Sequence, residues 1–182
     1  MSFHPTTQRL ILRAPMLADT SAFVALLNDY DVAKNMAQVA HPFTDALFRE
    51  ALAHTDRQRC ERNGFFFAVT RAMDGALIGA CAVDRIAGGV WEFGYWYGKQ
   101  HWGQGYATEG ARPVMRLAFE DMGAEMLVAH WYVDNPASGH VLDKLGFSPT
   151  GVEQRNCLAR GQAVASNRAQ LTRAQFARKK AA

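Results

Sequence analysis

The stretch Lys99-Gln100-His101-Trp102-Gly103-Gln104-Gly105-Tyr106-Ala107 decides the fold of this chain. Residues 90–97 before it are aromatic and β-branched, which is typical of a strand, and apolar residues after it recur at helical spacing up to Met122. The stretch is therefore a turn between a strand and a helix. Two glycines one residue apart allow backbone angles that a Cβ resists, so successive N–H groups can converge on one anion. We expect this turn to bind a pyrophosphate.

Two other classes of glycine-rich, phosphate-binding turn fit this sequence less well. The dinucleotide-binding fingerprint needs a third glycine where Thr108 stands, and the NTPase loop needs a Gly-Lys-Ser/Thr tripeptide that this chain lacks. The longer pattern Gln100-x-x-Gly103-x-Gly105-Tyr106-Ala107 resembles the acetyl-CoA loop of the GNAT superfamily of N-acetyltransferases. A glycine turn that binds nothing is the competing interpretation.

Length and composition suit one domain over residues 1–182, because 49% of the 182 residues are apolar and can form a sizeable core. No apolar run of about 18 residues exists, and Met1-Ser2-Phe3-His4-Pro5 lacks the features of a signal peptide, so we expect a cytoplasmic protein without a membrane segment. The net charge of +3 is too small to predict nucleic-acid binding. We interpret the basic residues near the end as a solvated face, with RNA, an acidic partner or a nucleotide phosphate as alternatives: Arg155, Arg160, Arg168, Arg173, Arg178, Lys179 and Lys180.

The cysteines and histidines suggest no metal site. Cys60, Cys81 and Cys157 are far apart, so neither a disulfide framework nor a zinc site is indicated, and we expect all three to pack as small apolar residues. None of the six histidines pairs with another at helical spacing. We interpret His130 as an ordinary surface or core histidine.

Periodicity predicts the element order βααβββαβαββ, an α/β (α+β) architecture with a mixed, mostly antiparallel, twisted sheet and helices on both faces. Pro113 lies inside the helix that follows the glycine turn, where it removes a backbone bond and predicts a kink. Strands are expected at residues 7–13, 65–70, 76–84, 90–97, 126–133, 150–159 and 162–172, and helices at about 20–27, 31–36, 44–63, 107–122 and 136–145.

A second motif follows the strand at 126–133. Asn135 stands where a strand ends and a helix begins, which favours a capping role, and Gly146 closes that helix. Asn135-x-x-Ser138 followed by Lys144-x-Gly146-Phe147 also resembles the other widely shared GNAT segment, in the order that the family requires. The opening Thr7-x-Arg9-Leu10-x-Leu12-Arg13 is similar to the RimJ/RimL-like branch, which includes enzymes that acetylate N-terminal amines of ribosomal proteins.

The resemblance implies how acetyl-CoA is held. The end of the strand before the loop would pair with the pantetheine arm and point an amide at the thioester oxygen, and Gly94 would form a bulge that splays this strand from its parallel neighbour. Asn135 would bond a pantetheine amide. The implied cofactor-binding residues are Tyr95, Trp96 and Tyr97 in the strand, Gln100, His101, Trp102, Gly103, Gln104, Gly105, Tyr106 and Ala107 in the loop, and Asn135 and Ser138 beyond it.

Two residues are candidates for proton transfer. Leu142 stands where many family members carry the tyrosine that protonates the leaving sulfur, and Ser138 matches the serine of the RimJ/RimL-like branch instead. A helix-start serine that bonds the backbone is the alternative for Ser138. Glu92 is the only acid on the strand that enters the site, and burial among aromatic residues would raise its pKa toward that of a useful base. An exposed strand glutamate is the alternative for Glu92.

Taken together, the motifs predict an acetyl-CoA-dependent N-acetyltransferase that transfers acetyl directly to a primary amine in a ternary complex. The RimJ/RimL-like features favour a protein or peptide N-terminus. Small amines such as amino sugars, polyamines or amino acids remain alternatives, and so does a non-catalytic acyl-CoA-binding module. Acceptor contacts are expected from residues 29–43 and from the turn at Arg160-Gly161, and a homodimer is an expectation from the family alone.

Overall fold

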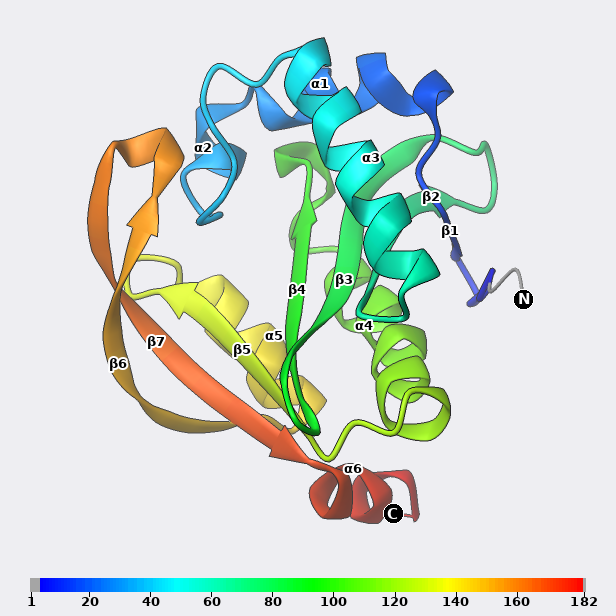
Figure 1. Cartoon of the computed structure of the whole chain (residues 1–182), viewed down its shortest axis with the longest axis vertical. Coiled ribbons are helices and arrows are strands. Elements are labelled where there is room, and N and C mark those ends of the chain that lie inside the picture. The colour runs from blue at the N-terminus through cyan, green and yellow to red at the C-terminus, as the bar shows by residue number, and fades with distance from the viewer. Residues whose placement is uncertain (1–3, 182) are drawn as a thin grey trace.

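The computed structural model describes residues 4–181, so Met1, Ser2 and Phe3 of the segment read for a signal peptide, and Ala182, lie outside it. Its centre is one seven-stranded sheet in the order β1-β2-β3-β4-β5-β7-β6 (Figure 1). All neighbouring strands pair antiparallel except β4 and β5, which are parallel. The predicted mixed, mostly antiparallel sheet is therefore confirmed.

The elements follow the predicted order, with one further helix after the last strand. The strands are β1 (Leu10–Arg13), β2 (Gly64–Arg71), β3 (Leu77–Ala87), β4 (Val90–Tyr97), β5 (Met126–Tyr132), β6 (Ser148–Cys157) and β7 (Gln162–Thr172). The helices are α1 (Thr20–Leu27), α2 (Tyr30–Ala33), α3 (Asp45–Cys60), α4 (Tyr106–Arg116), α5 (Pro136–Leu145) and α6 (Arg173–Ala181). The single turn α2 corresponds to the helix expected at 31–36. Helix α6, which was not predicted, follows the last strand.

The first strand begins later than predicted, because Thr7 forms a turn. The Thr7 amide donates to the Leu10 carbonyl at 2.8 Å, and the Leu10 amide donates to the Thr7 hydroxyl oxygen at 3.0 Å. The Thr7 amide, which a longer β1 would offer to β2, is thus bonded inside the turn. Thr7 and Arg9 thereby become free to contact residues outside the sheet.

Helices cover both faces of the sheet, and each face has its own apolar core (Figure 1). On one face, α4 and α5 pack on the sheet through residues such as Val114, Leu142 and Leu127. On the other face, α1 to α3 pack through Phe23 and Phe48, whose rings stack with centroids 4.7 Å apart. Strand β4 lies between the two cores, so its alternate side chains serve opposite faces.

Capping residues bound the helices, as the sequence predicts for Asn135 and Gly146. The Thr44 hydroxyl accepts a hydrogen bond from the Leu47 amide at the start of α3, and Asn135 accepts one from Ser138 at the start of α5. Gly146 ends α5 in the left-handed conformation, with φ +97°. These caps fix where α5 starts beside β5.

Helix α4 continues through Pro113 and changes to π-helical hydrogen bonding at Leu117–Asp121. Pro113 has no amide to donate inside the helix, and its side chain is buried with those of Val114 and Met115. The kink expected at Pro113 stays a prediction.

The three cysteines differ from one another. Cys81 and Cys157 are buried as expected, but Cys60 is exposed at the end of α3, so the expectation that it packs as an apolar residue is wrong. It occupies the last position of the helix, where the amphipathic pattern is already broken by polar neighbours.

Among residues 4–181, no helix combines the length and the hydropathy needed to cross a bilayer.

The close approach of β3 to β4 at Gly79 gives a stability prediction. A Cβ on Gly79 would lie 2.3 Å from the Trp96 carbonyl oxygen, whereas a Cβ on Gly94 of the adjacent strand would meet no atom within 4 Å. We expect Gly79→Ala to cost about 1–3 kcal/mol of unfolding free energy, as overpacking does, and Gly94→Ala to cost far less. Thermal unfolding of the two variants tests this, and equal melting temperatures would contradict it.

Candidate active site

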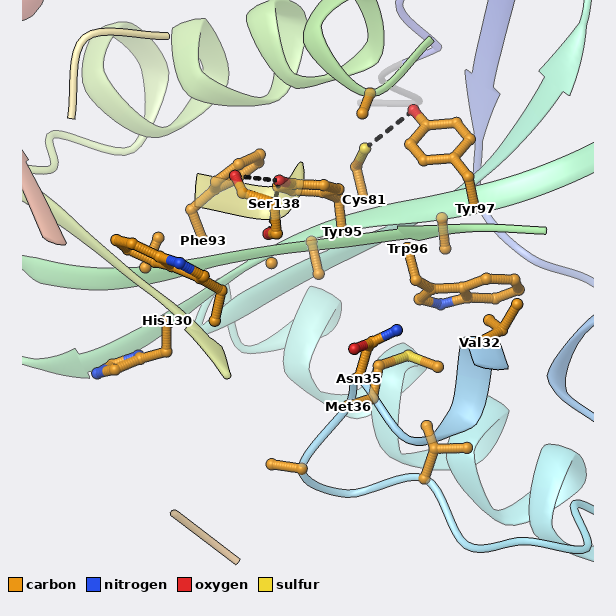
Figure 2. Close-up of a pocket in the computed structure, with 18 of the residues that line it drawn as sticks. Val32, Asn35, Met36, Cys81, Phe93, Tyr95, Trp96, Tyr97, His130 and Ser138 are labelled. Atoms are coloured by element: carbon orange, nitrogen blue, oxygen red, sulfur yellow. Dashed lines mark hydrogen bonds between the residues drawn. The ribbon is translucent and has the colours of Figure 1, made fainter. Parts of the chain in front are cut away.

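A cavity of about 1230 Å³ runs along the second half of β4 and reaches both faces of this strand. Figure 2 shows Trp96 directed toward Val32, Asn35 and Met36, while Tyr95 lies on the other side of the strand with Ser138. The cavity thus has two parts. We call the part toward α2 and α3 the acceptor side and the part toward α4 and α5 the cofactor side.

The cavity exists because β4 and β5 separate. Their parallel pairing covers only Val90, Trp91 and Glu92, opposite Met126 to Val128. Beyond Glu92, no strand of the described chain pairs with this edge of β4. Backbone groups along that edge are therefore open to an extended ligand.

The predicted bulge at Gly94 is wrong, although the predicted separation of the strands is there. The register of β4 with β3 runs without a shift from Trp91 to Tyr97, and Gly94 pairs regularly with Ala82. The separation comes from β5 alone. What glycine provides at position 94 is space, because no atom lies within 4 Å of where its Cβ would stand.

The glycine loop has the backbone that its sequence predicts. Gly103 and Gly105 take φ values of +73° and +80°, and Gly105 is the N-cap of α4. Within the described chain, the amides from Gly103 to Thr108 have no hydrogen-bond partner. Six consecutive residues at the positive end of a helix therefore offer their N–H groups to an anion.

Side chains of the loop mostly stabilise the loop itself. The Trp102 indole donates to the Tyr97 carbonyl at 2.7 Å, and the Gln104 side-chain nitrogen Nε2 donates to the Gln100 carbonyl at 3.0 Å. Gln100 and Gln104 do not line the cavity. The predicted cofactor-binding residues that do line it are Tyr95, Trp96, Tyr97, His101, Trp102, Gly103, Gly105, Tyr106, Ala107, Asn135 and Ser138.

Arg9 fastens the loop to the start of the chain, which sequence reasoning missed. Its guanidinium forms an ion pair with Glu109 at 2.6 Å, donates to the Gln104 carbonyl at 3.0 Å, and lies 4.5 Å from the centre of the Tyr106 ring. Thr7 donates to the same carboxylate at 2.6 Å. The only signal in the sequence was the presence of Thr7 and Arg9 in the opening motif.

Asn135 and Ser138 lie together at the start of α5. The Asn135 side-chain oxygen accepts from the Ser138 amide at 3.3 Å, and its side-chain nitrogen has no partner in the described chain, so it can donate to a ligand. The Ser138 hydroxyl contacts the Tyr95 hydroxyl at 2.8 Å. No bond from this hydroxyl to the backbone is present in residues 4–181, which removes the alternative of a serine that bonds the helix start.

Glu92 faces the acceptor side, but its pKa moves opposite to the prediction. Burial alone would raise the pKa, yet the hydrogen bond with His130 Nδ1 at 3.0 Å and the ion pair with Arg155 at 2.7 Å outweigh burial and lower it to about 2. The expectation of a raised pKa is therefore wrong. Arg155 comes from β6, 63 residues further along the chain, and no local pattern predicts that contact.

His130 lines the cavity and has an acid on each ring nitrogen, which fits the interpretation as a core histidine, but its place beside Glu92 was not predicted. Its Nδ1 faces Glu92 and its Nε2 lies 3.2 Å from a Glu153 carboxylate oxygen. Both contacts are hydrogen bonds only when both ring nitrogens carry protons. Alternation along β5 places His130 on the acceptor side, but only the sheet order brings it between two acids.

Asp84 is the carboxylate opposite Glu92 in the register of β3 and β4. It packs on Gly64, where a Cβ would lie 2.2 Å from its Oδ1 atom. Desolvation, and then the charge of Glu92, raise its pKa to about 6. No ion pair of Asp84 occurs in the described chain, in contrast to Glu92.

The lowered pKa of Glu92 predicts a pH-dependent contribution to stability. A carboxylate with a folded pKa of about 2 and an ordinary value of 4.5 stabilises the fold fully above pH 4.5, and this contribution is lost as pH falls toward 2. We expect Glu92→Gln to lower the unfolding free energy at pH 7 by more than at pH 3. Denaturant unfolding at both values tests this.

The exposed Glu50 on α3 supplies the matched control, because Glu50→Gln removes a carboxylate that forms no ion pair in the described chain. A loss for Glu92→Gln that is the same at both pH values would contradict the assignment.

Known proteins share this fold. A structure called ribosomal-protein-S5-alanine acetyltransferase from Vibrio fischeri superposes with a TM-score of 0.83 at 16% identity, covering 96% of this chain and 98% of that chain. A spermidine N-acetyltransferase from Vibrio cholerae, solved with CoA and spermine, superposes with a TM-score of 0.79 at 19% identity, covering 94% and 99%.

Sequence comparison identifies the family. A protein from Bacillus licheniformis called uncharacterized N-acetyltransferase p20 is 27% identical over 161 residues, which cover 87% of this chain and 89% of that protein. The family model described as an acetyltransferase (GNAT) domain matches residues 9–148, most of the chain and all of the site from Arg9 to Ser138. The chain therefore belongs to the GNAT family of acetyltransferases.

Proposed function

We propose that this protein transfers acetyl from acetyl-CoA to the N-terminal amine of a protein or peptide. The observation that carries the proposal is the run of unpaired amides from Gly103 to Thr108 directly beside the open edge of β4. A linear ligand with a diphosphate at one end and amide groups along its arm matches both features at once. Acetyl-CoA has this form, and it supplies an activated thioester.

On the cofactor side, the residues bind acetyl-CoA and orient it. The loop amides hold the diphosphate, and the Arg9–Glu109 ion pair keeps the loop in its binding conformation before the ligand arrives. The Asn135 side-chain nitrogen donates to an amide oxygen of the arm. The backbone N–H groups of Tyr95 and Tyr97, which face away from β3, stabilise negative charge that develops on the thioester oxygen.

The charges of the acceptor side favour a peptide over a polycation. Asp31, Glu92 and Asp134 line the cavity, and each is already held by a lysine or arginine of this chain: Asp31 by Lys99 at 2.6 Å, Glu92 by Arg155, and Asp134 by Arg160 at 2.6 Å. Asp84 also lines the cavity, and of these four acids it alone has no ion pair in the described chain. A polyamine with several charges finds few free carboxylates, whereas an N-terminus presents one amine.

Apolar side chains complete the acceptor side. Trp96 packs edge-on against Phe23 with ring centroids 5.6 Å apart, and Met36, Val39 and Phe66 line the same region. These surfaces suit the first side chains of a peptide. The predicted contact regions at 29–43 and at Arg160 meet here, because the Arg160 guanidinium donates to the Lys34 carbonyl at 2.8 Å.

The groups assigned to the leaving sulfur and to the acceptor amine lie on opposite faces of β4. Ser138 is the hydroxyl assigned to the leaving sulfur, since it lies on the cofactor side beside the open strand edge. Glu92 remains ionised at working pH, and Arg155 and His130 both bind its Oε1 atom, so we assign its other oxygen to accepting a hydrogen bond from the acceptor amine. A base role for Glu92 requires a pKa that its partners do not allow. The amine proton leaves to water in the cavity.

The proposal predicts activity toward peptides. With acetyl-CoA present, a panel of unblocked peptides should give thiol release at rates well above those with the same peptides N-acetylated, and above those with spermidine or amino sugars. Release is read by a thiol reagent, and mass spectrometry locates the acetyl group. A panel without turnover, despite CoA binding in a titration, would favour a non-catalytic CoA-binding module.

The loop gives a second prediction. Gly105→Ala forces a side chain into φ +80°, which costs about 1–2 kcal/mol, so we expect KM for acetyl-CoA to rise about tenfold. Gly75→Ala is the matched control, because Gly75 has φ +71° in the turn between β2 and β3, outside the cavity. It carries similar strain and should leave KM unchanged. Equal effects of both variants would mean that only general stability is involved.

A further inference from the structure

The hydroxyl of Tyr95 contacts Ser138 twice. It lies 2.8 Å from the Ser138 hydroxyl oxygen and 3.1 Å from the Ser138 carbonyl oxygen. The two residues come from β4 and from the first turn of α5, and Figure 2 shows their side chains facing each other on the cofactor side. The contact therefore spans the gap in which the thioester arm is proposed to lie.

Proton counting allows two arrangements of this pair. A tyrosine hydroxyl has one proton, and so has a serine hydroxyl. If Tyr95 donates to the Ser138 carbonyl, the Ser138 proton points at Tyr95 and is unavailable to a ligand. If Tyr95 donates to the Ser138 hydroxyl oxygen, the Ser138 proton is free to point into the cavity. A negative charge next to Ser138 favours the second arrangement.

We propose that Tyr95 is a positioning residue, whose hydroxyl donates to Ser138 and thereby directs the Ser138 proton to the sulfur that leaves the thioester. This inference rests on the proposed function. It assigns Tyr95 a side-chain role, whereas the motif implied only a backbone role in holding the pantetheine arm.

The surroundings of Tyr95 keep it a donor. Its ring packs against Phe93 with centroids 5.7 Å apart, which fixes the direction of the hydroxyl. Burial raises the pKa of Tyr95 above its ordinary value, so the phenol keeps its proton at working pH. Tyr97, two residues further, cannot replace it, because its hydroxyl donates to the Tyr106 carbonyl at 3.1 Å.

The chemical step balances without a further reactant. When the carbon–sulfur bond breaks, its electron pair stays on sulfur as a thiolate, and Ser138 donates a hydrogen bond to it. The acceptor ammonium first loses one proton to water, and the neutral amine then forms the new carbon–nitrogen bond and releases a second proton to water. Water returns one proton to the thiolate, and Tyr95 and Ser138 end the cycle protonated as they began.

A double-mutant cycle tests the coupling of the two hydroxyls. Because one hydrogen bond contributes about 1 kcal/mol, we expect Tyr95→Phe to lower kcat about fivefold with KM for acetyl-CoA unchanged. In the Ser138→Ala background, Tyr95→Phe should cause no further loss. Tyr97→Phe, which removes a buried phenol from the same strand, should act independently of Ser138→Ala. An equal loss from Tyr95→Phe in both backgrounds, or none in either, overturns the inference.

A binding experiment tests the contact between Tyr95 and Ser138 without catalytic turnover. Free thiols ionise near pH 8.5, so CoA binding is measured by calorimetry at pH 7 and pH 9.5, with desulfo-CoA as the matched ligand. We expect Tyr95→Phe to weaken CoA binding at pH 9.5 severalfold and to leave desulfo-CoA unaffected. Equal weakening of both ligands, or of neither, overturns the inference.

The two experiments separate this inference from the proposed function. If no amine is acetylated but the sulfur-dependent binding effect is present, the proposed function fails and the Tyr95 assignment stands. If peptides are acetylated and Tyr95→Phe changes neither kcat nor sulfur-dependent binding, the Tyr95 assignment alone fails.

Discussion

The parting of β4 from β5 after Glu92 is the constraint on which the site depends. Three parallel residue pairs hold the strands together, and beyond them the sheet continues on one side only, through the unbroken register with β3. An open strand edge in the middle of a sheet would ordinarily expose polar backbone at a cost. Here the edge faces a cavity, and it divides that cavity into a cofactor side and an acceptor side.

Polar contacts between residues far apart in the sequence fix the side chains on both sides of this gap. On the cofactor side, Arg9 and Glu109 join the first strand to the glycine loop, so a flexible turn is held in one conformation. On the acceptor side, Arg155 and His130 hold the Glu92 carboxylate and set its pKa. In the first case the ion pair restricts the loop, and in the second the partners stabilise a partly buried negative charge.

The acceptor side is closed by chain segments far apart in the sequence. The turn between β6 and β7 touches the segment after α2, where the Leu158 amide donates to the Ala37 carbonyl at 3.1 Å. Arg160 reaches Asp134, the residue before Asn135, so the wall of the acceptor side is linked to the residue assigned to the cofactor arm.

The sequence by itself determined the element order, the glycine loop and the helix ends at Asn135 and Gly146, because these depend on local backbone angles and nearby hydrogen bonds. It could not determine the direction of the Glu92 pKa, the place of His130, or the contacts of Arg9 and Tyr95. Each of those depends on a partner between 38 and 100 residues away. Tertiary structure decided them, since electrostatic and hydrogen-bond partners are set by which strands become neighbours in the sheet.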